Sequence, residues 1–322
     1  MYQKPDPTLW HGRQDGLDYD HQRWHQGIKM MDLSQNLPMG NKTPTLLGFA
    51  CDEGVRRNEG RTGASNGPNA LRNACRNLPW HFPEYFALFD AGNIVCEANQ
   101  LETAQIDLGN AVYQLQKKQY FTAILGGGHE VLFGHYQGLR KAHPKAKIGI
   151  INFDAHFDLR AVNPVIGPTS GTGFWQIAQM EPLHYLVLGI QKSGNTRALF
   201  NFAKEKQVLM VHAVDFRPEL LGNLITKVQD FIYAVDYVYL TICLDVFAAA
   251  YAPGVSAPTA LGLIPNAIFR DVLLTITRSP KLISMDIAEL NPQFDEGDRT
   301  AKLAAQLLFE VLDSFTQTHY SQ

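Results

Sequence analysis

The sequence predicts an α/β fold: a single domain built on a mostly parallel sheet of about eight strands, with helices on both faces. Two observations lead to this prediction. Short apolar runs rich in β-branched residues recur along the 322-residue chain, and segments with helical periodicity separate most of them. The runs are apolar throughout rather than alternating, which is typical of strands buried on both faces of a parallel sheet.

The order of these segments supports one domain rather than two. We expect strands over residues 43–50, 121–127, 147–153, 183–190, 207–213, 238–246 and 281–290. We expect helices over residues 69–78, 102–119, 131–142, 196–207, 266–278 and 299–317. No internal repeat or low-complexity linker divides the chain. Residues 1–40 are expected to form an irregular arm on this core, so that residues 1–322 make a single catalytic domain.

Composition and charge exclude several classes of function. The formal net charge of −3 gives no electrostatic basis for binding nucleic acid or an anionic membrane. No stretch approaches the roughly 18–20 apolar residues of a membrane span, and the N-terminus lacks the apolar core of a signal peptide. The four cysteines, Cys51, Cys75, Cys96 and Cys243, are scattered and form no CxxC pair. We therefore expect a reduced, cytoplasmic protein.

The segment "INFDAHFDLR", residues 151–160, places three polar groups at the end of an apolar run. Asp154, His156 and Asp158 stand at every second position, so on an extended segment they would point the same way. Such a cluster at the end of a buried strand needs a positive charge among its members. Carboxylates combined with imidazoles favour Mn²⁺, Zn²⁺ or Fe²⁺ over Ca²⁺ or Mg²⁺.

A glycine run, "GGGHE" at residues 126–130, follows another expected strand. A glycine-rich turn between strand and helix could hold a phosphate, although the run lacks the ending of a P-loop and the spacing of a dinucleotide-binding fold. Alternatively, the glycines allow close backbone approach, and His129 lies in the same crevice as the "DAHFD" residues.

A third motif, "LTICLDVFAAAYAPGVSAP" at residues 240–258, again alternates polar groups along a strand: Thr241, Cys243 and Asp245. Taken alone, Cys243 could be a small buried apolar residue and Asp245 a helix cap. The ligand-binding edge of an open parallel sheet lies at the carboxyl ends of its strands, where all three motifs are expected.

Together and in this order, the three motifs resemble those of the arginase (ureohydrolase) superfamily, GGxHs, DAHxD and SxDxDxxDPxxxPGxxxP. The resemblance extends to residues 48–72 and 284–308 and so covers nearly the whole chain from about residue 43. Within the superfamily, "LWHGRQD" (9–15) and "PGVSAP" (253–258) are most similar to the formimidoylglutamases. The resemblance implies an arginase-like three-layer α/β/α fold and a homo-oligomer.

The resemblance also implies a site with two Mn²⁺ ions per subunit. One ion would be held by His129, Asp154, Asp158 and residue 243, and the other by Asp154, His156, residue 243 and Asp245. A hydroxide bridging the ions would attack an amidine carbon, with Glu289 facing the cationic end of the substrate. The implied reaction is cleavage of N-formimidoyl-L-glutamate to L-glutamate and formamide, in histidine degradation. Arg160, Ser170 and Thr172 could then bind the substrate carboxylates.

The sequence departs from the superfamily pattern at Cys243, where a bridging aspartate is expected. A thiolate there would restore the charge of the ligand set, but it is softer than Mn²⁺ prefers. A neutral thiol would leave one metal weakly held, and both alternatives remain open. The third motif also lacks its usual "DP". Alternative functions are therefore another ureohydrolase acting on a guanidino or amidino acid and a metal-poor arginase-like binding protein. The glycine run at residues 126–130 gives a third alternative, a nucleotide-binding protein.

Overall fold

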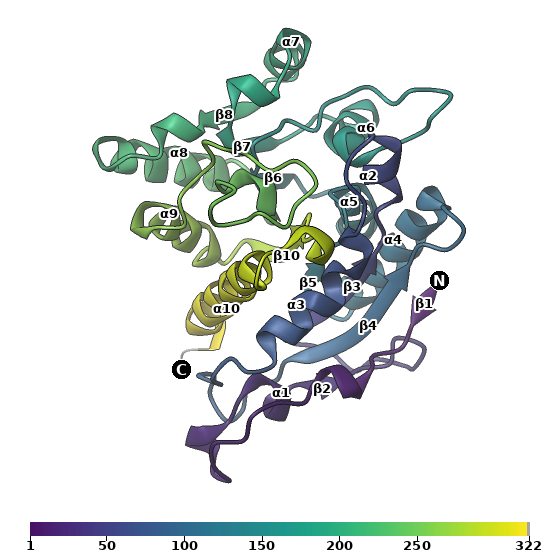
Figure 1. Cartoon of the computed structure of the whole chain (residues 1–322), viewed down its shortest axis with the longest axis vertical. Coiled ribbons are helices and arrows are strands. Elements are labelled where there is room, and N and C mark those ends of the chain that lie inside the picture. The colour runs from purple at the N-terminus through teal and green to yellow at the C-terminus, as the bar shows by residue number, and fades with distance from the viewer. Residues whose placement is uncertain (321–322) are drawn as a thin grey trace.

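A ten-stranded sheet forms the centre of the computed structural model, which describes residues 1–320 (Figure 1). The strand order is β1-β4-β3-β5-β10-β9-β6-β7-β8, and β2 pairs with β4. Every pair is parallel except β1 with β4. The strands are Tyr2–Gln3 (β1), Lys29–Met30 (β2), Pro44–Ala50 (β3), Phe89–Val95 (β4), Phe121–Leu125 (β5), Ile148–Phe153 (β6), Tyr185–Ile190 (β7), Leu209–His212 (β8), Tyr237–Cys243 (β9) and Leu282–Ala288 (β10).

The predicted fold class is confirmed. The seven predicted runs correspond to β3 and to β5 through β10, and β4 brings the number of longer strands to the expected eight. The two remaining strands, β1 and β2, are two residues long and lie within the N-terminal 40 residues.

Strand β4 was not predicted because its sequence, "FDAGNIV", contains residue types that are depleted in strands. Gly92 has a φ of +81°, and Asp90 is fully buried. Asp90 forms an ion pair with Arg72 of the helix Gly67–Cys75, with 2.8 Å between Arg72 Nε and Asp90 Oδ2. It also accepts a hydrogen bond from the Trp10 indole. The polar residues of β4 therefore attach the N-terminal segment to the sheet.

Helices cover both faces of the sheet, as predicted (Figure 1). One layer contains Gly67–Cys75 (α3), Leu221–Tyr233 (α8), Ala267–Thr277 (α9) and Arg299–Tyr320 (α10). The other contains Leu101–Lys117 (α4), Val131–Ala142 (α5), Gly173–Met180 (α6) and Arg197–Glu205 (α7). Two short helices, Trp24–Gly27 (α1) and Glu53–Arg57 (α2), lie in connections.

Aromatic contacts join each layer to the sheet. On the first face, the ring of Phe153 in β6 lies 4.9 Å from that of Phe269 in α9. On the second, the ring of Phe174 in α6 stacks on Tyr185 of β7 with 3.7 Å between centroids. Such buried rings account for a large share of the apolar area that stabilises the layers.

The strand order determines where a site can form. Strands β5, β10, β9 and β6 are consecutive neighbours and parallel, so their carboxyl ends meet at one edge of the sheet. Within residues 1–320, no helix is both long and apolar enough to cross a membrane.

Candidate metal centre

The carboxyl ends of β5, β10, β9 and β6 surround a cavity of about 100 Å³. His129 follows β5, the "DAHFD" segment follows β6, Cys243 ends β9, and Glu289 follows β10. The cavity is lined by Asn58, His129, His156, Asp158, Arg160, Ser170, Gly171, Gly194, Asn195, Leu199, Cys243, Asp245, Ser256, Ala257 and Glu289.

The glycine run before His129 serves close backbone packing. The amide of Gly126 donates to the carbonyl of Ile287 at 2.7 Å, and that of Gly128 donates to the carbonyl of Cys51 at 2.9 Å. A Cβ atom at Gly127 would lie 1.7 Å from the same Cys51 oxygen, so a side chain cannot fit there. Because these two amides donate to neighbouring backbone carbonyls, the run does not present them to a phosphate.

The "DAHFD" residues converge through a turn, so the expectation of an extended segment is wrong. Strand β6 ends at Phe153, and Asp158 has a left-handed φ of +49°. Asp154 is fully buried, and its Oδ1 accepts the amide hydrogen of His156 at 2.7 Å. The turn is held by Asn195, which accepts from the Phe157 amide and donates to the Ala155 carbonyl.

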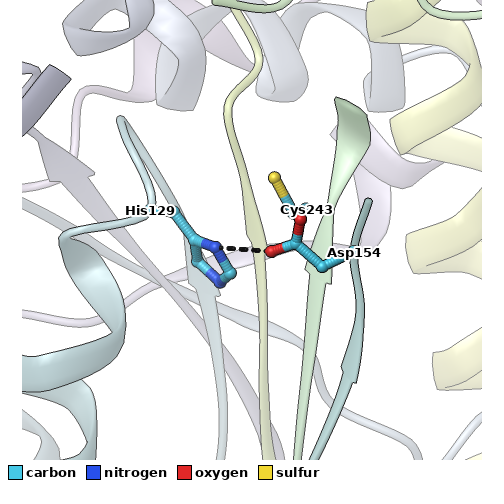
Figure 2. Close-up of side chains that lie close together, drawn as sticks. All are labelled: His129, Asp154 and Cys243. Carbon is cyan, nitrogen blue, oxygen red and sulfur yellow. Dashed lines mark ion pairs between the residues drawn. The ribbon is translucent and has the colours of Figure 1, made fainter. Parts of the chain in front are cut away.

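Two groups of potential ligand atoms share Asp154. His129, Asp154 and Cys243 form one group, and Asp154, His156 and Asp245 form the other; within each, the ligand atoms lie within 4.8 Å of one another. Figure 2 shows the first group, with the His129 ring beside the Asp154 carboxylate and the Cys243 sulfur above it. Asp158 joins this group through Oδ2, which lies 2.9 Å from Nδ1 of His129.

The third motif contributes from two kinds of structure. Thr241 and Cys243 lie on β9, whereas Asp245 lies just beyond it, in the 3-10 helix Leu244–Val246. His156 Nδ1 lies 3.3 Å from Asp245 Oδ2 and 3.5 Å from Asp154 Oδ1. Thr241 lies beneath the cluster, with its hydroxyl oxygen 2.9 Å from Nε2 of His129. The structure thus brings together all six residues expected to hold metal.

The charges of the cluster are unbalanced without a cation. Burial alone would lower the pKa of both histidines, but the surrounding carboxylates reverse this effect. Asp154 and Asp158 raise the pKa of His129 well above 6.5, and Asp245 with Asp154 raises that of His156 to about 12. The two imidazoles therefore hold protons where a metal ion would otherwise bind.

Cys243 experiences the same excess of negative charge. Burial raises the pKa of its thiol well above 9, and the charges of Asp154, Asp245 and Glu289 raise it further. A bound divalent cation reverses this balance, since a coordinating thiol is deprotonated outright. The ionisation of Cys243 therefore depends on whether metal is present.

The residues present fit a pair of metal ions. Within residues 1–320, buried atoms that have no hydrogen-bond partner include Asp245 Oδ1 and Glu289 Oε2. Unpaired buried polar atoms are rare in native proteins, and these two belong to residues that line this cavity. Imidazole nitrogens, carboxylate oxygens and a thiol make a donor set suited to Mn²⁺, Fe²⁺ or Zn²⁺.

Glu289 occupies a strained position at the cavity wall. Its φ is +69°, which is uncommon for a residue with a side chain. Oε1 accepts the amide hydrogen of His129 at 2.8 Å. Burial, followed by the charges of Glu130 and Asp245, raises the pKa of Glu289 to about 8.

The residues expected to contact substrate lie in different environments. Arg160 is exposed at the cavity, and its guanidinium donates to the side chain of Asn58, which donates to the Ser170 hydroxyl at 3.2 Å. Thr172 lies outside the cavity lining and donates its hydroxyl to the Thr169 carbonyl, so its placement indicates a capping role instead of a substrate contact.

Sequence reasoning did not identify Asn58 or Asn195, although both line the cavity. Asn58 follows the short helix α2, and Asn195 follows a 3-10 turn. Each is an isolated asparagine in a loop, a common position for this residue type. No pattern in the sequence distinguishes them from ordinary loop residues.

Comparison with known proteins gives matches that cover most of the chain. Residues 42–313 match the model of the arginase family. Formimidoylglutamase from Lysinibacillus sphaericus (strain C3-41) is 45% identical over 318 residues, covering 98% of each chain.

Two solved structures have the same fold. The crystal structure of formimidoylglutamase from Bacillus subtilis superposes with a TM-score of 0.82 at 23% identity, covering 93% of this chain and 94% of the other. A variant of formiminoglutamase from Trypanosoma cruzi, crystallised with Mn²⁺, gives a TM-score of 0.77 at 25% identity over 85% of this chain and 93% of the other. Both the motifs and the coverage lead to one conclusion: this chain belongs to the arginase family.

Proposed function

We propose that this protein hydrolyses N-formimidoyl-L-glutamate to L-glutamate and formamide, the reaction of histidine degradation, at a centre of two Mn²⁺ ions. The observation that carries the proposal is the pair of ligand groups that share Asp154. The name of the Lysinibacillus relative and the Mn²⁺ in the Trypanosoma structure support the substrate and the metal.

Six residues would hold the metal ions. One ion would be held by His129, Asp154, Asp158 and Cys243, and the other by Asp154, His156 and Asp245. Two such ions supply a water of lowered pKa and stabilise negative charge that develops on the reacting group. The short distances between Cys243, His129 and Asp154 support Cys243 as a ligand on that side of the centre.

Glu289 would bind the amidinium group of the substrate. Its Oε1 is occupied by the His129 amide, whereas its buried Oε2 has no hydrogen-bond partner within residues 1–320. A carboxylate at this wall would orient the cationic carbon toward the ligand cluster and stabilise its charge. The raised pKa means that Glu289 holds a proton near neutral pH in the metal-free protein, and a bound cation would displace it.

Arg160, Asn58 and Ser170 would bind a carboxylate of the substrate. Their side chains form a linked row at the cavity, and the only formal charge in the row is the Arg160 guanidinium. A guanidinium with neighbouring amide and hydroxyl donors matches a carboxylate better than it matches a second cation. This row favours a formimidoyl amino acid over agmatine, which lacks a carboxylate.

The test is release of formamide and glutamate by metal-stripped protein, with and without added Mn²⁺. Activity should require Mn²⁺ and should be lost in Asp154→Asn, while Asp20→Asn, an exposed change in the N-terminal segment, should behave as the parent. Arginine and agmatine serve as competing substrates. Turnover of either in preference to N-formimidoylglutamate would contradict the proposal, and a protein without bound metal or turnover would support the binding-protein alternative.

We further propose that residues 1–322 act as a single catalytic domain with residues 1–40 as its arm, that the protein is cytoplasmic, and that it is a homo-oligomer. All four cysteines are free thiols, which fits a reducing compartment. Large apolar side chains such as Tyr233 and Leu261 are more than four-fifths exposed, which fits a further interface. Light scattering on the purified protein tests the oligomer directly.

A further inference from the structure

A chain of buried hydrogen bonds lies beneath the candidate metal centre. His129 Nε2 lies 2.9 Å from Thr241 Oγ1, and the Thr241 hydroxyl donates to Asp286 Oδ1 at 2.5 Å. Thr241 and Asp286 are register partners on the adjacent strands β9 and β10. At most 1% of any of the three residues is exposed, so water cannot replace these bonds.

The direction of each hydrogen bond in this series follows from which groups carry a proton. A carboxylate accepts hydrogen bonds only, so the single proton of Thr241 must go to Asp286. The Thr241 oxygen is then left to accept from His129, which requires a proton on Nε2. A metal-binding His129 must be neutral, and its imidazole then carries only this one ring proton, so Nδ1 keeps its lone pair. Nδ1 is the nitrogen that lies 3.1 Å from Asp154 Oδ2 and 2.9 Å from Asp158 Oδ2.

Asp286 is itself held in place from its other oxygen. Oδ2 accepts a hydrogen bond from the Tyr239 hydroxyl and lies 2.8 Å from Nδ1 of His135, a residue of α5. Burial and the Asp286 charge raise the pKa of Tyr239 well above 10, so Tyr239 remains a donor. With Oδ2 occupied by two donors, Oδ1 stays directed at Thr241.

Asp286 and His135 also line up with a serine, but these three residues do not form a second hydrolytic site. Ser284 Oγ lies 2.5 Å from His135 Nε2, so Ser284, His135 and Asp286 make a serine–histidine–aspartate line. All three side chains are fully buried, and the Ser284 hydroxyl also contacts Thr122 across the sheet. A substrate has no access to this serine. The three residues therefore help to hold Asp286 in place and do not catalyse hydrolysis.

We propose that Asp286 and Thr241 are positioning residues of the metal centre, committing His129 to the tautomer that presents Nδ1 to a metal ion. Hydrogen-bonded partners of metal-ligating histidines orient the ring and tune its affinity for metal. The proposal rests on the proposed function in one respect, because His129 must be a metal ligand.

The test compares two substitutions of Thr241 with a matched control. Thr241→Val removes the hydroxyl at nearly constant volume, whereas Thr241→Ser keeps it. Thr45→Val is the control: Thr45 is fully buried on β3, and its hydroxyl has no hydrogen-bond partner in the described part of the chain. Mn²⁺ affinity is measured by calorimetry on metal-stripped protein, together with the thermal midpoint of that protein.

Thr241→Val should weaken one of the two Mn²⁺ ions by about 10–100-fold. Thr241→Ser should bind within about 3-fold of the parent, and Thr45→Val should bind as the parent does. Parent-like Mn²⁺ affinity in Thr241→Val would overturn the proposal, whatever the change in thermal midpoint, because the hydroxyl would then have only a structural role.

A second variant keeps the test decisive if Thr241→Val does not fold. In Asp286→Asn, Tyr239 and His135 require the amide oxygen, so the amide nitrogen would face Thr241 and donate to it. Thr241 would then donate to His129 Nε2 and move the ring proton to Nδ1, the nitrogen that faces the cluster. Mn²⁺ affinity should fall by at least about 10-fold, and unchanged affinity would refute the proposal.

His129→Ala separates this proposal from the proposed function. If His129→Ala retains both Mn²⁺ ions with parent affinity, His129 is not a ligand and the metal assignment itself fails. If His129→Ala loses a metal ion while Thr241→Val and Asp286→Asn bind as the parent does, only the positioning proposal fails.

Discussion

His156 Nδ1 and Asp245 Oδ2 lie 3.3 Å apart, although β6 and β9, the strands that precede them, are separated by two further strands in the sequence. Their proximity is a consequence of sheet order, since β6 and β9 are neighbours with the same direction. The pair supplies two of the three residues that would hold one of the two ions.

We therefore expect His156→Asn to remove one of the two Mn²⁺ ions and to lower turnover by at least about 100-fold. The measurement is metal content after desalting, combined with formamide release. His184→Asn is the matched control, because His184 lies beside a groove at the opposite edge of the sheet. Retention of both ions in His156→Asn would assign the second ion to other residues.

Glu289→Gln should leave Mn²⁺ content unchanged while turnover falls by about 100-fold or more. Glutamine keeps the size of the side chain but removes the charge that would pair with the amidinium. Glu181→Gln is the control, since Glu181 pairs with Arg140 away from the cavity. Equal loss of metal and activity in Glu289→Gln would show that this carboxylate is a metal ligand.

Much of the fold and of the cluster could be predicted from the sequence because both depend on local patterns. Apolar runs mark buried strands, and polar groups at their ends mark the edge where ligands bind. The three-dimensional partners could not be predicted. Asp286 sits inside the strand "LISMDIA" with nothing in its surroundings to relate it to His129, which is 157 positions earlier. Thr241 was recognised as part of a motif, but its contacts with both residues depend on strand register.

Without bound metal, the stability of the folded protein should fall as pH rises through neutrality. In the metal-free protein, the folded-state pKa is about 12 for His156 and about 8 for Glu289, both above the unfolded values of 6.5 and 4.5. The folded protein therefore binds more protons than the unfolded chain, and stability falls as pH rises. The contribution of Glu289 is lost between about pH 4.5 and 8, and that of His156 is lost from about pH 6.5 upward.

We expect the thermal midpoint of metal-stripped protein to fall by about 5 °C between pH 6.5 and 9. Saturating Mn²⁺ should abolish or invert this slope, because metal competes with the proton of His156 and its positive charge lowers the pKa of the nearby Glu289. The depressed pKa of Asp154 has the opposite sign, but it acts only below its ordinary value of 3.8 and lies outside this range. A midpoint that rises with pH in the stripped protein would contradict the expectation.

Arg160→Met should raise the KM for N-formimidoylglutamate by about 10–100-fold with little change in kcat, because a carboxylate contact made equally in ground and transition states affects binding alone. Methionine keeps much of the aliphatic length and removes the donors. Arg197→Met, an exposed change at the start of α7, is the control. Parent kinetics in Arg160→Met would remove Arg160 from the site.

Cys243 offers the sharpest test of the metal centre, because two substitutions should act in opposite directions. Burial, together with the charges of four nearby carboxylates, raises the pKa of the thiol and keeps it protonated in the absence of metal. If Cys243 is a ligand, Cys243→Asp should raise Mn²⁺ occupancy, since a hard carboxylate suits Mn²⁺ better than a soft thiolate. Cys243→Ser should lower occupancy, because a neutral hydroxyl is a weaker ligand. A metal-bound thiolate should make turnover of the parent sensitive to peroxide, because oxidation follows thiolate character, and Cys243→Asp should resist this loss. Cys75→Ser is the matched control: Cys75 is equally buried, on α3, and is absent from the cavity lining. Metal content and peroxide sensitivity equal to the parent in both Cys243 variants would show that the thiol serves only to pack the end of β9.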